Sequence, residues 1–256
     1  MLLVLLGVGY YYYGGYATQV QRMKEEALKF VRNSSVETFC SAQTSIVYDK
    51  DGKTISTLKG EKDVYYLSYE EIPADVCAAI VSIEDKKFYQ HNGVDFKAIL
   101  RAVKAAIENG EVTQGGSTIT QQLARTIFLT QERTWQRKVE EIFIATELEK
   151  KYSKTKILEF YLNNIYFGNG YYGIQAASMG YFNVEVNELD LSQMAFLCAI
   201  PNNPTLYDPL TNMVNTLGRR DRILNQMQED GKITEGACLM AKAQEIVLNR
   251  PAHAKN

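Results

Sequence analysis

The stretch ILEFYLNNIYFGNGYYGIQAAS, residues 157–178, contains two helical segments separated by a loop. Ser153 lies just ahead of it and is a residue type that caps helix N-termini, so we expect one helix from 153 to about 166. The segment 167–173 has three glycines in seven residues, which is typical of a loop. A second helix should follow over about 174–182. This helix–loop–helix pattern indicates an α-helical fold.

Helices are expected on both sides of this stretch. On its N-terminal side, TQQLARTIFL (120–129) and the segment 134–151 both have helical character. On its C-terminal side a helix over about 191–199 should end at PNNP, because proline cannot continue a helix. The tail alternates helix and turn, with Gly231 as a C-terminal stop. We therefore predict a mainly α domain.

Residues nearer the N-terminus add one further helix and a short hairpin. Pro73 can begin a helix, and Val76, Ile80 and Ile83 follow it at helical spacing. Upstream, TSIVYDKDGKTISTL (44–58) contains two β-type runs around an Asp-Gly dipeptide. Because Asp-Gly favours the tight turns that join antiparallel strands, we predict a small β-hairpin there.

The composition excludes several classes of protein. The chain has 256 residues, of which 46% are hydrophobic and 23% charged, so it can order itself around a core. No repeat period is visible, which excludes solenoids. A net charge of −2 without a basic stripe gives no argument for nucleic-acid binding. Four widely spaced cysteines and two histidines speak against a zinc centre, and their spacing does not reveal whether the cysteines pair.

Residues 1–21 carry no charged side chain, and five of them, at 10–13 and 16, are tyrosines. An apolar helix of this length reaches about 30 Å, the thickness of a hydrocarbon core, and tyrosine suits the membrane interface. We expect a retained transmembrane anchor. A cleaved signal peptide and a buried core helix are the alternatives. An amphipathic, charged helix over 22–38 should follow.

Glu84 is the first candidate for chemistry. It follows Ile80 by four residues and so continues the apolar stripe of the helix that begins at Pro73. A desolvated carboxylate has a raised pKa and makes a better general base. The alternative is a carboxylate at a helix end that turns to solvent.

The segment QGGSTITQQLARTIF (114–128) is the second candidate. Its glycines let the backbone approach a ligand, and Ser117, Gln121 and Arg125 are spaced by four, which would place them on one helix face. Hydroxyl, amide and guanidinium groups together suit sugars and phosphates. A polar, capped helix start is the alternative.

The segment TWQRKVEEIFIATELEKKY (134–152) is the third candidate. Glu141 shares a predicted helix face with Lys138, Ala145 and Leu148, which places an acid beside a semi-apolar stripe. Arg137 and Lys138 would hold a phosphate or form exposed ion pairs along the helix. Spacing alone leaves both interpretations open.

Five segments in this order resemble the peptidoglycan glycosyltransferases, glycosyltransferase family 51: EDKKFYQHNGVD, GGSTITQQLAR, RKVEE, ILEFYLNNIYFGNGYYGIQAAS and LSQMAFLCAIPNNPTLYDP. The chain is similar to the monofunctional, membrane-bound type. The resemblance implies a lysozyme-like, two-lobed helical domain over 65–250. It would follow a transmembrane anchor at 1–21 and a juxtamembrane helix and β-hairpin at 22–64.

The resemblance also implies an activity. Such enzymes polymerise lipid II into glycan strands by transferring the growing undecaprenyl-pyrophosphate-linked chain to the 4-hydroxyl of an incoming lipid II, with inversion. Glu84 would be the base, and Glu141 would help the pyrophosphate leave, directly or by binding a divalent cation such as Mg²⁺ or Mn²⁺. The substrate contacts would come from Ser117, Gln121, Arg125, Arg137 and Lys138.

The resemblance further implies a place in the cell and a set of partners. The domain would act at the outer face of the cytoplasmic membrane, beside penicillin-binding transpeptidases and other wall-synthesis proteins, without an organic cofactor or nucleic acid. Asp85, Phe88 and Asn163 would support the site. A lytic transglycosylase or muramidase that cleaves glycan strands, and an inactive wall-synthesis scaffold, are the alternative functions.

Overall fold

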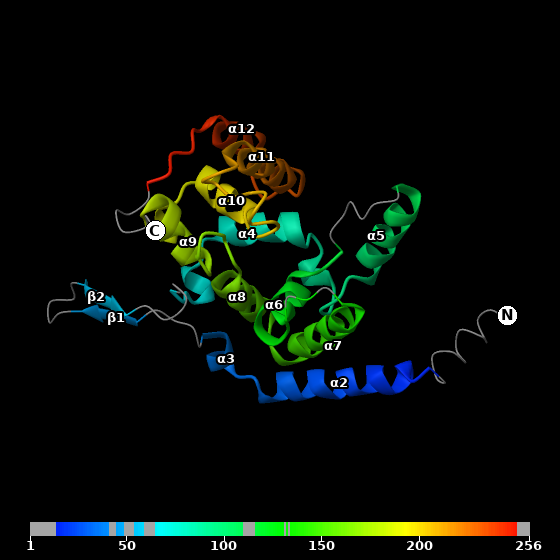
Figure 1. The fold of residues 1–256 in the computed structure, drawn as a ribbon. Helices are drawn as coiled ribbons and strands as arrows, with labels where there is room; N and C mark the ends of the chain where they lie inside the picture. The colour runs from blue at the N-terminus through cyan, green and yellow to red at the C-terminus, as the bar shows by residue number, and fades with distance from the viewer. Residues whose placement is uncertain are drawn as a thin grey trace. The chain divides into compact units, whose positions relative to one another are not determined.

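A computed structural model describes residues 14–40, 45–48, 54–58, 65–109, 116–130, 132 and 134–249. Within these ranges the protein is mainly helical, as predicted (Figure 1). The chain divides into two compact units, each assembled from segments that are distant in sequence. The first unit takes its described residues from Met1–Ser35 and His91–Ser153, and the second from Val36–Gln90 and Lys154–Asn256.

The first unit contains four described helices. They are α2 (Tyr16–Asn33), α5 (Phe96–Asn109), α6 (Ile119–Phe128) and α7 (Trp135–Lys151). The predicted helices over 120–129 and 134–151 are confirmed as α6 and α7. Both begin at a threonine whose hydroxyl accepts the backbone N–H three residues later, which satisfies one of the free donors of a helix start.

Helix α2 packs along α7 (Figure 1). Its buried residues, Met23, Ala27 and Val31, recur every four positions and form one apolar face. At its C-terminal end, the ammonium of Lys151 donates to the carbonyl oxygens of Val31, at 2.8 Å, and Ser34. The charged side chain thereby satisfies carbonyls that the end of a helix leaves unpaired.

The predicted helix over 22–38 differs from the observed one. Helix α2 begins at Tyr16 and ends at Asn33, and a separate short helix, α3 (Val36–Cys40), follows. Ser34 is the reason for the break: its backbone is extended, and its hydroxyl donates to the Val31 carbonyl at 2.8 Å, which replaces a continuing helical hydrogen bond.

The second unit contains α3, the short helices η1 (Tyr69–Glu71), η2 (Phe88–Gln90) and η3 (Val186–Glu188), and the strands β1 (Ser45–Tyr48) and β2 (Thr54–Leu58). Its six further described helices are α4 (Ala74–Glu84), α8 (Lys154–Asn164), α9 (Ile174–Phe182), α10 (Leu191–Ala199), α11 (Met213–Glu229) and α12 (Glu235–Ala243). Strand β1 pairs antiparallel with β2, with an irregularity after Val47, as predicted for 44–58. The turn between the strands lies outside the described residues.

Helix α4 lies in the core of the second unit, where it packs against α10 and α11 (Figure 1). The predicted stripe is largely confirmed, because Val76 and Ile80 are completely buried. Burial extends to further faces of the helix, including Cys77, Ala79 and Val81. Helix α4 is therefore an interior helix rather than an amphipathic surface helix.

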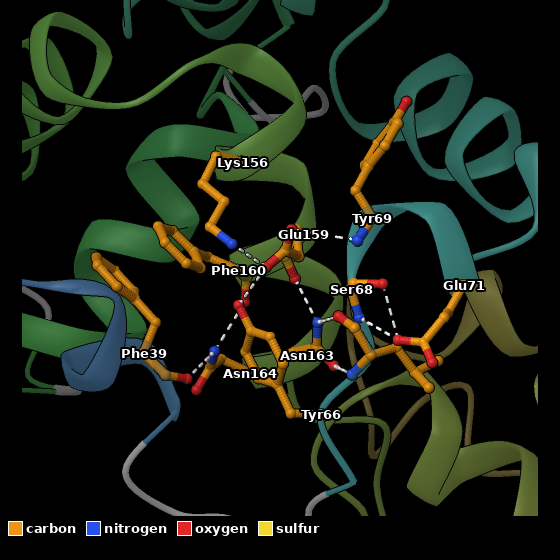
Figure 2. Close-up of polar contacts among 11 residues, drawn as sticks. Phe39, Tyr66, Ser68, Tyr69, Glu71, Lys156, Glu159, Phe160, Asn163 and Asn164 are labelled. Atoms are coloured by element: carbon orange, nitrogen blue, oxygen red, sulfur yellow. Dashed lines mark hydrogen bonds and ion pairs between the residues drawn. The ribbon is translucent and has the colours of Figure 1, made fainter.

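A buried polar network joins the segment before α4 to α8 (Figure 2). The side-chain amide of Asn163 both accepts from the N–H of Leu67 and donates to its carbonyl, each at 2.8 Å. Glu159 accepts from the hydroxyl of Tyr66 at 2.6 Å and from Lys156 at 2.5 Å. Burial, together with the Glu159 carboxylate, raises the pKa of Tyr66 and keeps it a donor. These contacts fix the chain as it enters the helix that carries Glu84.

The glycine loop predicted at 167–173 is confirmed between α8 and α9. Gly168, Asn169, Gly170 and Gly173 all have positive φ. At Gly173 a side chain would also collide with the main chain, because an added Cβ would lie 2.6 Å from the carbonyl oxygen of Asn163. The sequence therefore needs glycine at this position for both backbone conformation and space.

Among the described residues, no helix combines the length and the apolar content that crossing a bilayer requires. Residues 1–13 lie outside the described part, so the anchor over 1–21 stays a prediction, and its described end belongs to α2. The four cysteines are free thiols: Cys40, Cys77, Cys198 and Cys238.

Candidate active site

Glu84 is the last residue of α4, and its side chain is only 7% exposed. Its Oε1 accepts from the guanidinium of Arg219 on α11, 2.8 Å away, and the amide nitrogen of Asn202 lies 3.5 Å from the same oxygen. The carboxylate is thus buried and paired rather than turned to solvent. Of the two interpretations of Glu84, the structure supports a desolvated acid with a fixed orientation.

Glu141 lies on α7 and is completely buried. Its Oε2 accepts from the ammonium of Lys138 at 2.6 Å, and the guanidinium of Arg137 lies 3.5 Å from Oε1. The Lys138 ammonium also donates to the hydroxyl of Ser117 at 2.8 Å. Because Ala145 and Leu148 are also buried, the predicted helix face is confirmed. Two cations thus converge on one buried carboxylate.

These contacts do not fit a divalent cation on Glu141. Magnesium and calcium ions need several oxygen ligands, most of them anionic or carbonyl. Both Glu141 oxygens instead face protein cations, Lys138 and Arg137, which would repel a metal ion. No group of three or more acidic, histidine or cysteine side chains that suits a metal ion occurs among the described residues.

The predicted common face of Ser117, Gln121 and Arg125 is wrong. Helix α6 begins only at Ile119, with Thr118 as its N-cap, so Ser117 lies outside the helix. Gln121 is completely buried, and its Oε1 accepts from the N–H of Thr118 at 3.1 Å. Its side chain closes a capping box through Oε1, and its part in substrate binding stays a prediction. Arg125 lies in the last turn of α6 and is partly exposed.

The start of α6 is held against the residues that precede α5. The Thr118 hydroxyl donates to the carbonyl of Gly93 at 2.6 Å. Gly93 has a φ of 88°, and an added Cβ would lie 2.6 Å from the carbonyl oxygen of Ala145 on α7. This close approach fixes the N-terminus of α6 near α7, and Ser117 comes within reach of Lys138 as a result.

The residue that sequence reasoning missed is Arg219. It lies 135 positions after Glu84, on a helix that carries several other charged residues. No spacing rule connects the two, and only the packing of α11 on α4 brings them together. Of the residues expected to support the site, Phe88 and Asn163 are completely buried, and Asp85 is 7% exposed.

The model of one protein family, described as Transglycosylase, matches residues 51–228. The chain belongs to the transglycosylase family. Both buried acids, Glu84 and Glu141, lie within the matched residues. The match thus places both acids in one family domain.

Relatives of this transglycosylase are larger proteins. It is 39% identical to penicillin-binding protein 4 of Bacillus subtilis (strain 168) over 90% of this chain and 37% of that protein. It is 41% identical to penicillin-binding protein 1A of Escherichia coli (strain K12) over 79% of this chain and 24% of that protein. The chain therefore spans between a quarter and two fifths of the length of these relatives.

A crystal structure of penicillin-binding protein 1A from Haemophilus influenzae is also similar. It aligns with a TM-score of 0.47 and 21% identity over 82% of this chain and 22% of that chain.

Proposed function

We propose that this transglycosylase polymerises lipid II into the glycan strands of peptidoglycan. The growing chain, linked to undecaprenyl pyrophosphate, is transferred to the 4-hydroxyl of an incoming lipid II with inversion at the anomeric carbon. The observation that carries the proposal is that one family match contains two buried, cation-paired carboxylates. The fold that we infer for the domain is lysozyme-like and two-lobed.

Glu84 is the general base in this proposal. Attack by a sugar hydroxyl requires removal of its proton as the new bond forms, and a carboxylate can accept that proton. The base must be ionised and correctly oriented before the hydroxyl arrives. The contact with Arg219 at the end of α4 supports the second requirement, because it orients the carboxylate.

The group around Glu141 stabilises the departing pyrophosphate. Lys138 and Arg137 carry positive charges that can turn from Glu141 toward phosphate oxygens as negative charge develops there. Ser117 shares the Lys138 ammonium and so belongs to the same group. Arg125 supplies a further guanidinium from α6. We route no step through a divalent cation, because Glu141 faces protein cations.

The location and partners follow from the substrate. Lipid II carries a polyprenyl tail, so the enzyme would work at the outer face of the cytoplasmic membrane, held there by an anchor at 1–21. Residues 22–64 would connect that anchor to a catalytic domain at 65–250. Penicillin-binding transpeptidases and other wall-synthesis proteins would be its partners, since glycan strands are cross-linked after polymerisation.

The proposal is tested by incubating the purified, detergent-solubilised protein with labelled lipid II and separating the products on a gel. We expect a ladder of glycan strands that moenomycin blocks. Parallel reactions with magnesium and with a chelator test the cation separately. Release of fragments from finished peptidoglycan without a ladder would instead indicate a lytic enzyme. If the protein forms neither product, it is an inactive scaffold.

A further inference from the structure

Arg219 occupies an unusual position for an arginine of the second unit. Its guanidinium lies 2.8 Å from Oε1 of Glu84, and only 11% of its side chain is exposed. The ring of Tyr207 lies on another side, with its centroid 5.1 Å from Cζ of Arg219. Stacking on a ring restricts the orientation of the guanidinium plane, and the contact with a carboxylate restricts its distance from that group.

The neighbouring arginine on α11 has a different environment. The Arg220 guanidinium donates to the carbonyls of Lys242 and Gln244 and to the hydroxyl of Ser192, at 3.0 to 3.2 Å. These contacts join α11 to the start of α10 and to the end of α12, so Arg220 holds the fold together. Arg219 instead points its charge at the one acid that the proposed reaction uses as a base.

We propose that Arg219 is a positioning residue for Glu84. The inference rests on the proposed function, because it assigns Arg219 a role only through the base. Two groups, Arg219 and Asn202, converge on the same oxygen, and fixing Oε1 fixes the plane of the whole carboxylate. The carboxylate is thereby aimed before the acceptor hydroxyl arrives, which removes an entropic cost from the reacting state. Arg219 thus acts on the reaction only through its contact with Glu84.

The alternative role for this pair is purely structural. A buried ion pair between α4 and α11 is weak evidence for stability by itself, since desolvation offsets much of the attraction. A structural role would lower thermal stability and reduce the amount of active enzyme. A positioning role acts on the reacting state through Glu84, so it lowers kcat in folded enzyme and leaves KM for lipid II nearly unchanged.

The test compares R219Q, R219K and the control R222Q, which removes the same charge from an exposed position on the same helix. Lipid II polymerisation gives kcat and KM, and a thermal melt reports folding. We expect kcat of R219Q to fall roughly 10- to 100-fold with KM within about twofold, since misplacing a reacting group costs rates of this order. R219K should lie between R219Q and wild type, because lysine keeps the charge without the planar fork. R222Q should match wild type.

Chemical rescue adds a readout that a structural role would not move. R219A opens space beside Glu84, and added guanidinium ion can occupy it. We expect millimolar guanidinium to raise kcat of R219A several-fold and to leave R222Q unchanged. If R219Q fails to fold, R219K decides: a reduced kcat with an intact melt supports the inference, and a wild-type kcat overturns it.

The outcomes separate this inference from the proposed function. If wild type makes glycan ladders and Glu84→Gln does not, but folded R219Q keeps wild-type kcat, Arg219 has no positioning role while the function stands. Equal losses in R219Q and R222Q would also overturn the inference. If wild type makes no ladder, the proposed function itself fails, whatever Arg219 does.

Discussion

Glu84 and Glu141 are both buried beside arginine or lysine. The sequence placed a cation near Glu141 but gave no indication of the arginine beside Glu84. Lys138 lies three residues from Glu141 on one helix, so helical spacing placed the two on one face and left an ion pair along the helix as one of two interpretations. Arg219 reaches Glu84 from a distant helix, and no local pattern could predict that contact. Ser117 was wrongly placed on the helix of Gln121 and Arg125 because a helical repeat does not reveal where a helix begins. Local periodicity therefore finds the acids and misses the partners supplied by tertiary packing.

Glu84→Gln should abolish polymerisation while the fold persists. Glutamine has nearly the same shape and can still contact Arg219, but it cannot accept the acceptor's proton. A general base contributes roughly 10²- to 10⁴-fold in rate, so a loss of this size is expected in the lipid II ladder assay. A thermal melt controls for folding. Near wild-type polymerisation would show that another group is the base.

Lys138→Gln should lower both activity and stability. The change leaves Arg137 as the other cation beside the buried Glu141 carboxylate. The Lys138–Glu141 pair is partly exposed, since 38% of the Lys138 side chain is accessible. We expect a loss of about 1–2 kcal/mol in the free energy of unfolding, measured by urea titration, after allowance for solvent screening.

The matched control for Lys138→Gln is Lys150→Gln. Lys150 makes the same kind of contact three residues from Glu147 on the same helix, but that lysine is 65% exposed. An exposed pair of this kind contributes about 0.5 kcal/mol or less. Equal losses in the two variants would show that burial of Glu141 does not matter to the pair.

At the scale of elements, the positions of glycine and of capping residues allowed most helices to be predicted closely. Helices α9 and α10 have the predicted bounds, and α11 ends where Gly231, with a φ of 67°, terminates it. Helix α5 was not among the predicted helices, although Asp95 precedes it and accepts from the N–H of Ala98 at 3.0 Å, a cap that the sequence offers. Ser34 divided a helix predicted as continuous, because a serine hydroxyl can compete for backbone carbonyls.

Gly173→Ala should destabilise the loop between α8 and α9 more than Gly170→Ala does. Both glycines have φ near 85°, so both variants carry the strain of a left-handed backbone, about 1–2 kcal/mol. Only at Gly173 does the new Cβ also meet a backbone carbonyl, at 2.6 Å, whereas Gly170 has open space. Urea midpoints of the two variants should differ clearly. Equal midpoints would mean that the main chain relaxes at no cost.

The Asp230→Asn variant should be less stable than wild type only at pH values at which the Asp230 carboxylate is ionised. Asp230 caps α11 and pairs with Lys86. Burial raises its pKa, but hydrogen bonds from Lys86, Ser82 and Gln226 outweigh burial, and the net pKa is lowered. A lowered folded-state pKa stabilises the fold above the unfolded value, about 3.9, and this contribution disappears as the pH falls through the folded value. The difference in urea midpoint between wild type and variant should be largest near pH 7 and shrink below pH 4. A constant difference would exclude this linkage.

At the scale of the whole molecule, the chain crosses between its two compact units more than once, so each unit joins distant segments. Composition and periodicity predicted a mainly helical protein but not this division. The reason is that the division depends on long-range contacts such as those between Lys151 and the end of α2, 120 positions away. The sequence pattern of each helix records which face is buried, not which helix covers it.

Lys151→Gln should increase local unfolding in the first unit, at the end of α2, and leave local unfolding in the second unit unchanged. The ammonium holds three carbonyls at the end of α2, those of Val31, Arg32 and Ser34. A hydrogen bond from a charged group contributes about 1.5–3 kcal/mol, so the amides at the end of α2 should exchange at least roughly tenfold faster. Hydrogen exchange read by mass spectrometry tests this, with α10 as the internal reference. Uniform acceleration in both units would show that they unfold together.

The packing of α2 along α7, together with the contact of Lys151 at the end of α2, has a mechanical consequence. Helix α2 has 18 residues, so it is a rod about 27 Å long at the standard rise per residue. Its partner α7 carries Lys138 and Glu141, and the two helices pack along each other. A force that tilts α2 would therefore also act on the helix that holds this pair of charges.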